Sequence, residues 1–179
     1  LNMVALPILA TEPPGDLTTG PSGGHTDLVT SGQYESSYVM YKTVDGIDYF
    51  IVRFRLGGSS TAPKGYTLLI DTDNNSNNNY SAANPCFERE VILQPGVGVV
   101  VNSLNASVTQ LAVFNADNYQ QRSIALSNIS GNPDYFYDFF VPVSSLNISG
   151  PVRMLVSSVI ASGQSGITGT LSDVNGVND

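Results

Sequence analysis

The alternation of apolar and polar residues is clearest between positions 37 and 56. Two such runs, Ser37–Val44 and Ile47–Leu56, flank the dipeptide Asp45-Gly46. Asp-Gly between alternating runs is a strong signal for a tight turn, so we expect an antiparallel hairpin here. Successive side chains of a strand point to opposite faces, and the second run places an uninterrupted apolar set on one of them. That set is predicted to face the core and consists of Phe50, Val52, Phe54 and Leu56.

Further runs rich in β-branched and aromatic residues follow at strand-and-turn spacing. They are Gly65–Asp71, Phe87–Leu93, Val97–Ser103, Ser107–Asn115, Ser123–Ile129, Tyr135–Val141 and Val152–Ala161. Helical periodicity is absent, apart from a single turn expected at Val143–Leu146 after Pro142. Strands that follow one another without intervening helices are typical of antiparallel sandwiches. The sequence therefore predicts an all-β, jelly-roll-like β-sandwich of about nine strands, with a closed barrel as the alternative.

The beginning of the chain has a different character. Between Thr11 and Gly24 the sequence is dense in proline and glycine. This composition opposes regular secondary structure and is typical of a linker or an arm draped over a domain. We therefore expect an N-terminal arm at residues 1–24 and the sandwich domain at residues 25–179.

Charge and composition narrow the classes of function. Seven Lys and Arg stand against fifteen Asp and Glu, which gives a net charge of −8. Nucleic acids and anionic membrane surfaces recruit clustered cations, so neither is an expected partner. No apolar run approaches the ~20 residues of a membrane span, so membrane insertion is not expected either. One His and one Cys exclude a Cys/His zinc cluster and an intrachain disulfide. Scarce Lys with abundant Asn, Ser, Thr and Gly favours an extracellular location.

The most distinctive segment, LIDTDNNSNNNY, begins at Leu69. An apolar strand ends here in side-chain oxygens at alternate positions: Asp71, Asp73, Asn75 and Asn77. This spacing suits a loop that wraps a hard cation, and calcium accepts 6–8 oxygen ligands. Glu88 on the next strand is a candidate fifth ligand. The alternative is a polar hairpin loop without a metal, in which Asn tolerates left-handed backbone.

The C-terminal stretch SDVNGVND offers a second group of oxygens, on Asp173, Asn175 and Asp179. These residues surround a glycine and are suited to a cation. Clusters of Asp, Asn and Gly are more often turns, so a turn is the favoured interpretation.

The sequence contains few residue patterns that are typical of catalytic sites. His25 and Asp27 lie close together in sequence without an adjacent nucleophile, and Cys86 is expected to be a small packed residue. Glu88 and Glu90 share one face of their strand, which allows a glycosidase pair, although such carboxylates more often face solvent or a cation. Nucleophile elbows, phosphate loops and dinucleotide fingerprints are missing from the sequence. We therefore do not expect an enzyme.

Tyrosines suggest a carbohydrate site, because sugar rings stack on exposed aromatic faces. The chain has nine Tyr but no Trp. Most of these tyrosines alternate with core residues along strands, so packing at the rim of the core is the favoured interpretation.

Several segments together resemble a known group of proteins. They are HTDLV from His25, YFIVRFRLGG from Tyr49, KGYTLLIDTD from Lys64, NPCFEREVIL from Asn84, NPDYFYDFFVPVSSL from Asn132, PVRMLVSSVIASGQSG from Pro151 and the closing SDVNGVND. This succession is similar to β-sandwich domains in large secreted proteins of gliding, surface-colonising Bacteroidetes. Those proteins are typically exported by the type IX secretion system and carry a gliding-motility-type C-terminal sorting region. More distantly, the layout resembles family 9 carbohydrate-binding modules.

This resemblance implies a non-catalytic module of a bacterial surface protein, located outside the cell. Asp71 and Asp73 would lie at a strand end beside a calcium-binding loop. The sequence departs from the pattern at Cys86, where glycine is expected, and it lacks the stacking tryptophans of sugar-binding modules. The favoured function is a structural or adhesive module that contacts other domains or copies of a surface protein. The alternative is a carbohydrate-binding module attached to a secreted enzyme, with a surface polysaccharide as partner.

Overall fold

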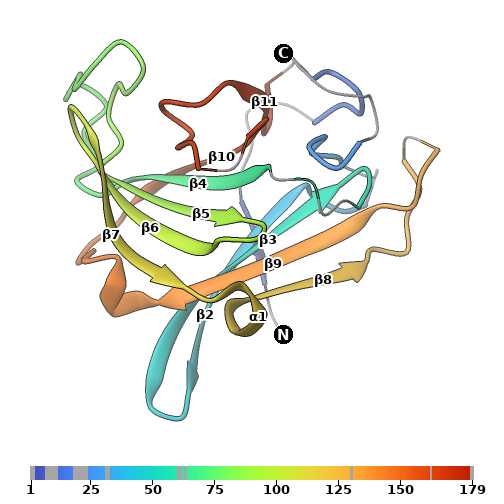
Figure 1. The fold of residues 1–179 in the computed structure, drawn as a ribbon, viewed down its shortest axis with the longest axis horizontal. Helices are drawn as coiled ribbons and strands as arrows, with labels where there is room; N and C mark the ends of the chain where they lie inside the picture. Colours follow the sequence, from blue (N-terminus) through green and yellow to red (C-terminus); the bar gives the residue numbers. More distant parts are fainter. Residues whose placement is uncertain are drawn as a thin grey trace.

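The computed structural model describes residues 3–6, 12–17, 24–30, 33–59, 62, 64–129, 131–161 and 163–177. Within these residues, a five-stranded and a six-stranded antiparallel sheet pack face to face (Figure 1). The chain folds this way because its strands present one apolar face each, and two such faces exclude water from a common core. The β-sandwich predicted from the sequence is confirmed.

The five-stranded sheet has the order β1-β2-β3-β9-β8. Its strands are β1 (Val4–Ala5), β2 (Ser37–Val44), β3 (Ile47–Leu56), β9 (Tyr135–Pro142) and β8 (Gln120–Ile124). The hairpin β2–β3 has the expected register, with Val44 opposite Ile47 across Asp45-Gly46. Asp45 and Gly46 both have positive φ, of 50° and 78°, as a tight hairpin turn requires.

The six-stranded sheet has the order β11-β10-β4-β5-β6-β7. Its strands are β11 (Leu171–Val174), β10 (Arg153–Val159), β4 (Gly65–Asp71), β5 (Arg89–Gln94), β6 (Gly98–Leu104) and β7 (Val108–Phe114). A short helix, α1 (Ala116–Tyr119), links this sheet to β8, and the 3-10 turn η1 (Val143–Ser145) follows β9 where a single turn was predicted. No helix in the described residues has the length and apolar character needed to cross a membrane.

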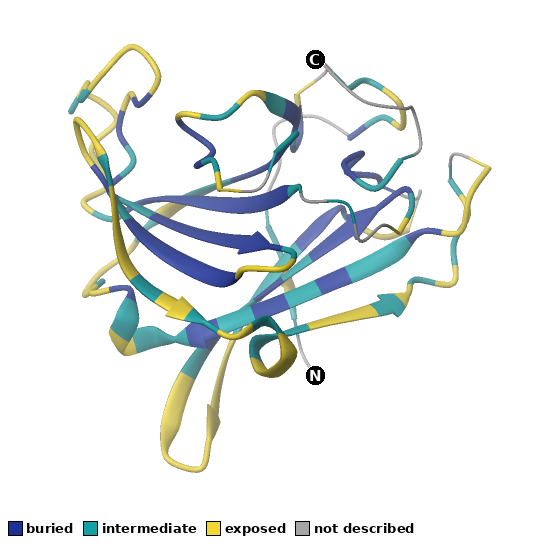
Figure 2. Cartoon of the chain, viewed as in Figure 1, coloured by how far each residue is buried: buried dark blue, intermediate teal, exposed yellow. Residues whose placement is uncertain are grey.

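The core lies between the two sheets. The four residues predicted to face it, Phe50, Val52, Phe54 and Leu56, are all fully buried. Aromatic contacts join the layers: Tyr66 of β4 meets Tyr137 of β9 with ring centroids 4.8 Å apart. Figure 2 shows this interior in dark blue, in contrast to the exposed end of the β2–β3 hairpin.

Two strands beyond the predicted set are present, which makes eleven in the described residues. β1 and β11 are short edge strands: β1 pairs with β2, more distant in sequence, whereas β11 pairs with the preceding strand β10. β1 and the buried Glu12 belong to the predicted arm, so the described parts of residues 1–24 lie against the sandwich. The domain boundary at residue 25 stays a prediction.

Candidate metal centre

β4 delivers the first predicted ligand to the edge of the sandwich. All of its residues are buried, and its last residue, Asp71, is 0% exposed. The Asp71 Oδ1 atom accepts a hydrogen bond from the backbone N–H of Asn75 at 3.2 Å. Oδ2 has no hydrogen-bond partner but lies 3.8 Å from the guanidinium of Arg153, on the adjacent β10. Asp71 is thus a buried carboxylate whose Oδ2 atom is compensated only by the charge of Arg153.

Asp73 lies two residues further on, in the exposed part of the loop. One oxygen accepts the backbone N–H of Asn75 at 2.9 Å, and the other accepts the side-chain amide of Asn78 at 2.9 Å. These hydrogen bonds, that of Asn78 above all, lower the pKa of the Asp73 carboxyl. The group is therefore an anion at neutral pH, as a cation ligand must be.

Glu88 arrives from the chain that leads into β5. Its backbone N–H donates to Ile70 at 3.0 Å, which sets it beside the end of β4. The side chain is 8% exposed, and its Oε2 accepts the backbone N–H of Thr72 at 2.7 Å. The other oxygen accepts the Tyr80 hydroxyl at 2.8 Å. Burial and this hydrogen bond to Glu88 raise the pKa of Tyr80 to about 12.

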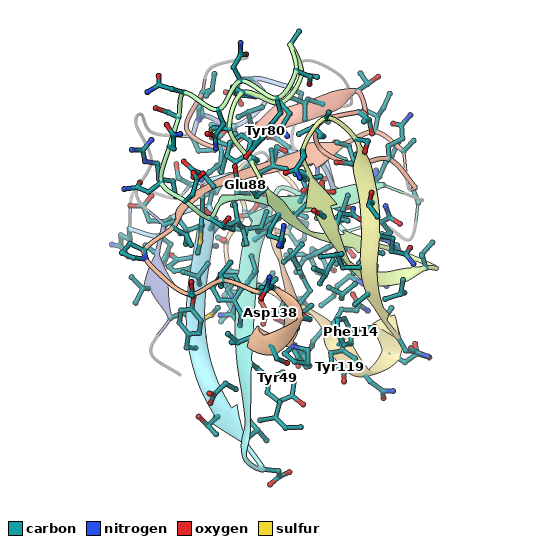
Figure 3. All side chains as sticks on the ribbon, turned by 90° about the vertical axis from the view of Figure 1, so that its left-hand side faces the viewer. Tyr49, Tyr80, Glu88, Phe114, Tyr119 and Asp138 are labelled. Carbon is teal, nitrogen blue, oxygen red and sulfur yellow. The ribbon has the colours of Figure 1, made fainter. Side chains whose placement is uncertain are left out.

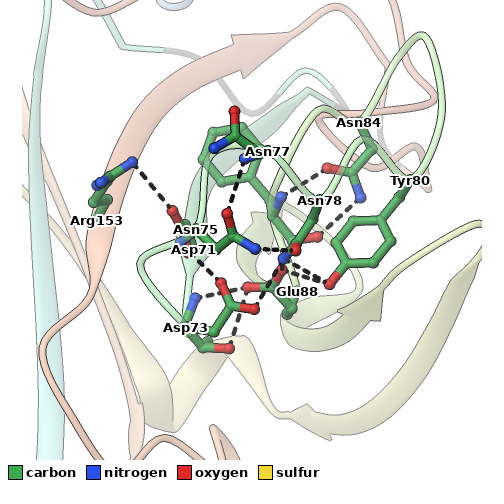
Figure 4. A network of polar contacts seen from close by, with 11 residues as sticks. Asp71, Asp73, Asn75, Asn77, Asn78, Tyr80, Asn84, Glu88 and Arg153 are labelled. Carbon is green, nitrogen blue, oxygen red and sulfur yellow. Dashed lines mark hydrogen bonds and ion pairs between the residues drawn. The ribbon is translucent and has the colours of Figure 1, made fainter.

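The three carboxylates converge. One oxygen each from Asp71, Asp73 and Glu88 lie within 4.8 Å of one another (Figure 4). Calcium binds oxygens at about 2.3–2.6 Å, so ligands on opposite sides of the ion are separated by about 4.6–5.2 Å. The separation of these three oxygens is compatible with ligands of one calcium ion.

A neutral side chain links two members of this cluster in the structure. The Asn78 amide nitrogen donates to Asp73 at 2.9 Å and to Glu88 at 3.0 Å. Rotation of this amide by half a turn would direct its oxygen, rather than its NH₂ group, toward the same two carboxylates. Asn78 therefore bridges Asp73 and Glu88 as a hydrogen-bond donor.

Of the five predicted ligands, the structure brings together the three carboxylates and leaves the two asparagines in other roles. Asn75 offers its backbone N–H to Asp71 and Asp73, while its side-chain amide donates to Asn78 at 2.6 Å. The backbone N–H of Asn77 donates to the Asn75 side chain at 3.2 Å. Sequence reasoning missed Asn78 and Tyr80, which the alternate spacing of oxygens does not include.

In the second predicted group of oxygens, Asp173 and Asn175 bind different parts of the chain. Asp173 is fully buried in β11 and accepts the backbone N–H of Leu28 at 2.6 Å. The Asn175 side chain instead binds the start of β2, through the hydroxyls of Ser36 and Ser37. Asp179 lies outside the described residues.

The residues considered as catalytic candidates have different surroundings in the structure. Burial, followed by the charge of Lys64, lowers the pKa of His25. Asp27 accepts the backbone N–H of Gly15 at 3.1 Å. Glu88 binds the Asn-rich loop, whereas Glu90 is held beneath a different loop by the backbone N–H of Gly166.

Cys86 is a free, buried thiol. Burial and the nearby carboxylates of Asp71 and Glu88 raise the pKa of this thiol. A raised pKa reduces the thiolate fraction at neutral pH and with it the reactivity of the sulfur.

A groove of about 380 Å³ lies on the outer side of the five-stranded sheet. Its lining combines aromatic rings with two arginines. The guanidinium of Arg55, a residue only 1% exposed, lies 4.6 Å from the Phe136 ring centroid and 5.2 Å from that of Tyr34. Arg53 forms two hydrogen bonds with Asp138, at 2.7 and 2.6 Å. Tyr34 remains 54% exposed and covers one side of the groove.

A chain of aromatic contacts lies elsewhere on the sandwich. It passes from Tyr49 through Phe140 and Tyr119 to Phe114, with centroid distances of 5.8, 5.4 and 4.8 Å. In Figure 3, Tyr49, Tyr119 and Phe114 gather in the lower half of the molecule, well away from Tyr80 and Glu88. A hollow of about 670 Å³ beside α1 contains none of the predicted ligands, and its Asn115 side chain caps that helix.

Comparison of the chain with protein-family models, curated proteins and solved structures finds no match.

Proposed function

We propose that this chain is a non-catalytic, extracellular structural or adhesive module of a bacterial surface protein, stabilised by calcium. The calcium part of this proposal is supported by the convergence of Asp71, Asp73 and Glu88. Extracellular calcium at about millimolar concentration suits a site with three carboxylates on a pre-folded sandwich. The surface-protein part is supported by the sequence resemblance described above.

The observation that carries the contact function is the end of the β2–β3 hairpin. This ribbon extends beyond the rest of the sandwich in Figure 2, and residues 41–48 are all exposed. It presents Tyr41, Val44 and Ile47, which are 58%, 44% and 47% exposed. Side chains alternate along a strand, so Tyr41 lies on one face of the ribbon, whereas Val44 and Ile47 lie on the other.

Apolar residues on both faces of a projecting two-stranded ribbon are suited to contact with a protein surface. A hairpin alone is marginally stable in water, and burial of these side chains against a second surface favours association. The proposed partner is another copy of the chain or an adjacent domain of the same surface protein.

Sedimentation equilibrium of the chain tests this contact. Ile47→Ser should weaken self-association by about tenfold or more, because it removes an apolar side chain from the contact. Ile124→Ser is the matched control, since Ile124 is 58% exposed on β8, away from the hairpin. Equal effects of the two substitutions, or association that neither alters, would contradict a role for the hairpin.

Saccharide binding is the second candidate function, and the groove beside Tyr34 favours it. An exposed tyrosine ring next to arginine hydrogen-bond donors offers the stacking surface and polar groups that sugars require. A polysaccharide pull-down that is positive for the parent chain and lost in Tyr34→Ala would support this function. Tyr41→Ala is the control, because Tyr41 is similarly exposed (58%) on the hairpin.

A further inference from the structure

A second group of carboxylates lies where the described part of the N-terminal segment meets the last strand. Glu12 and Asp16 belong to the segment 12–17, and Asp173 belongs to β11. One oxygen of each lies within 4.8 Å of the others. Glu12 and Asp173 are 0% exposed, and Asp16 is partly buried.

Backbone donors fix the two buried acids from separate parts of the chain. The Gly176 N–H donates to Glu12 Oε2, and the Leu28 N–H donates to Asp173 Oδ2 at 2.6 Å. The Thr30 hydroxyl also donates to the backbone carbonyl of Glu12 at 2.8 Å. These contacts hold the carboxylates near one another although they repel.

The remaining oxygen of Glu12 points to a ligand. Glu12 Oε1 is buried and has no hydrogen-bond partner, an unfavourable state for a carboxylate. The charges that act on this group are those of Asp173 and Asp16, both negative. Burial, followed by these charges, raises the pKa of Glu12 to about 9. A bound cation would compensate the buried oxygen and the repulsion together.

We propose that Glu12, Asp16 and Asp173 form a second divalent-cation site of the calcium type, which fastens the segment 12–17 to β11. Carboxylates alone suit a hard cation, and their separation suits the calcium–oxygen distance of about 2.3–2.6 Å. This site is distinct from the Asp71 centre. Figure 1 shows β11 near the N-terminal segment, at the opposite end of the strands of the six-stranded sheet from the loop between β4 and β5.

Hydrogen–deuterium exchange of the full chain, in calcium, in magnesium and in chelator, tests the proposal. The variants are Glu12→Gln, which removes the charge and keeps the shape, and Asp73→Asn, which alters only the other centre. Asp16→Asn provides a second, partly exposed position if Glu12→Gln does not fold. The peptides of interest cover residues 12–17 and 171–177, with residues 72–80 as the internal comparison.

Calcium should slow exchange at residues 12–17 and 171–177 of the parent chain, by about tenfold at a tenfold excess over the dissociation constant. Asp73→Asn should keep the calcium protection at residues 12–17 and 171–177 and lose it at residues 72–80. Glu12→Gln should lose the protection at residues 12–17 and 171–177 and keep it at residues 72–80. In chelator, Glu12→Gln should melt at about the parent's temperature, because Glu12 with its raised pKa is already neutral when no cation is bound.

Three results would overturn the site. One is exchange at residues 171–177 that is the same in calcium and in chelator. The second is calcium protection there that survives Glu12→Gln or, if that variant is unfolded, Asp16→Asn. The third is a loss of stability in Glu12→Gln that is equal with and without calcium, which would leave Glu12 only its hydrogen bond to Gly176. None of these results depends on the Asp71 centre or on the hairpin contact.

Discussion

Gly166 donates its backbone N–H to the Glu90 carboxylate at 2.6 Å, across 76 positions of sequence. Glu90 is fully buried on β5 and also accepts hydrogen bonds from Thr67 at 2.6 Å and Asn102 at 2.7 Å. The contact requires glycine, since a Cβ at position 166 would lie 2.7 Å from Thr67 Cγ2. A buried charge thereby fastens the loop before β11 to the outer face of the six-stranded sheet.

We predict that Gly166→Ala lowers the free energy of unfolding by about 1–3 kcal/mol, because the added methyl group must displace Thr67 or the loop. Gly150→Ala is the matched control, since a Cβ there would meet nothing within 4 Å. The control should stay within about 0.5 kcal/mol of the parent chain. Urea unfolding of both variants measures the difference, and equal stabilities would refute the close-contact argument.

Calcium should raise the melting temperature of the parent chain, and chelator should reverse the change. A ligand that binds only the folded state stabilises it by about 2.7 kcal/mol at a hundredfold excess over its dissociation constant. Asp71→Asn with Asp73→Asn should reduce this gain, while Asp117→Asn, at an exposed carboxylate on α1, should leave it unchanged. If neither calcium nor chelator changes the melting temperature of the parent chain, the site is excluded.

The single histidine should titrate below its ordinary pKa of about 6.5, because burial and then the charge of Lys64 disfavour its protonated form. A depressed folded-state pKa means that the unfolded chain binds protons more readily. The stability that this group contributes is therefore present above about pH 6.5 and is lost as the pH falls below that value through the folded-state pKa.

Proton NMR of the His25 ring gives this pKa directly, because no second histidine overlaps it. Lys64→Met should raise the pKa toward the ordinary value. A pKa at or above 6.5 in the parent chain would contradict the arrangement of His25 and Lys64.

Arg53 and Asp138 should be energetically coupled. Two charge-assisted hydrogen bonds join them across β3 and β9, and their side chains are 27% and 19% exposed. The pair raises the pKa of Arg53. A double-mutant cycle with Arg53→Met and Asp138→Asn should give a coupling of about 1–2 kcal/mol, between the values for exposed and buried pairs. Additive single-mutant effects would show that the pair contributes nothing to stability.

The sequence predicts the local elements of this fold better than the distant ones. The hairpin from Ser37 to Leu56 follows from alternation and Asp-Gly, both of which act within a few residues. β1 and β11 are not predicted, because strands of two and four residues are too short to show an alternating pattern. Leu171–Val174 also contains Ser172 and Asp173, whose burial has no counterpart in a local pattern.

The two candidate metal centres also differ in how far the sequence predicts them. Asp71, Asp73 and Glu88 could be grouped from the sequence, because adjacent antiparallel strands bring the end of one beside the start of the next. Asn75 and Asn77 alternate as ligands would, but in the structure the Asn75 side chain bonds to Asn78 and to the backbone N–H of Asn77. Glu12 and Asp16 could not be joined to Asp173, because no spacing rule links opposite ends of a chain.

The contact between Glu12 and Gly176 has a consequence for a module under tension. These residues are neighbours in space although 164 positions separate them. Among the described residues, β1 is the one strand that lies outside the span from Glu12 to Gly176. The sheets between residues 12 and 176 would carry little of the load until the contact broke. A cation bound by Glu12, Asp16 and Asp173 would raise the force needed to separate these segments. That force would then increase with the calcium concentration around the protein.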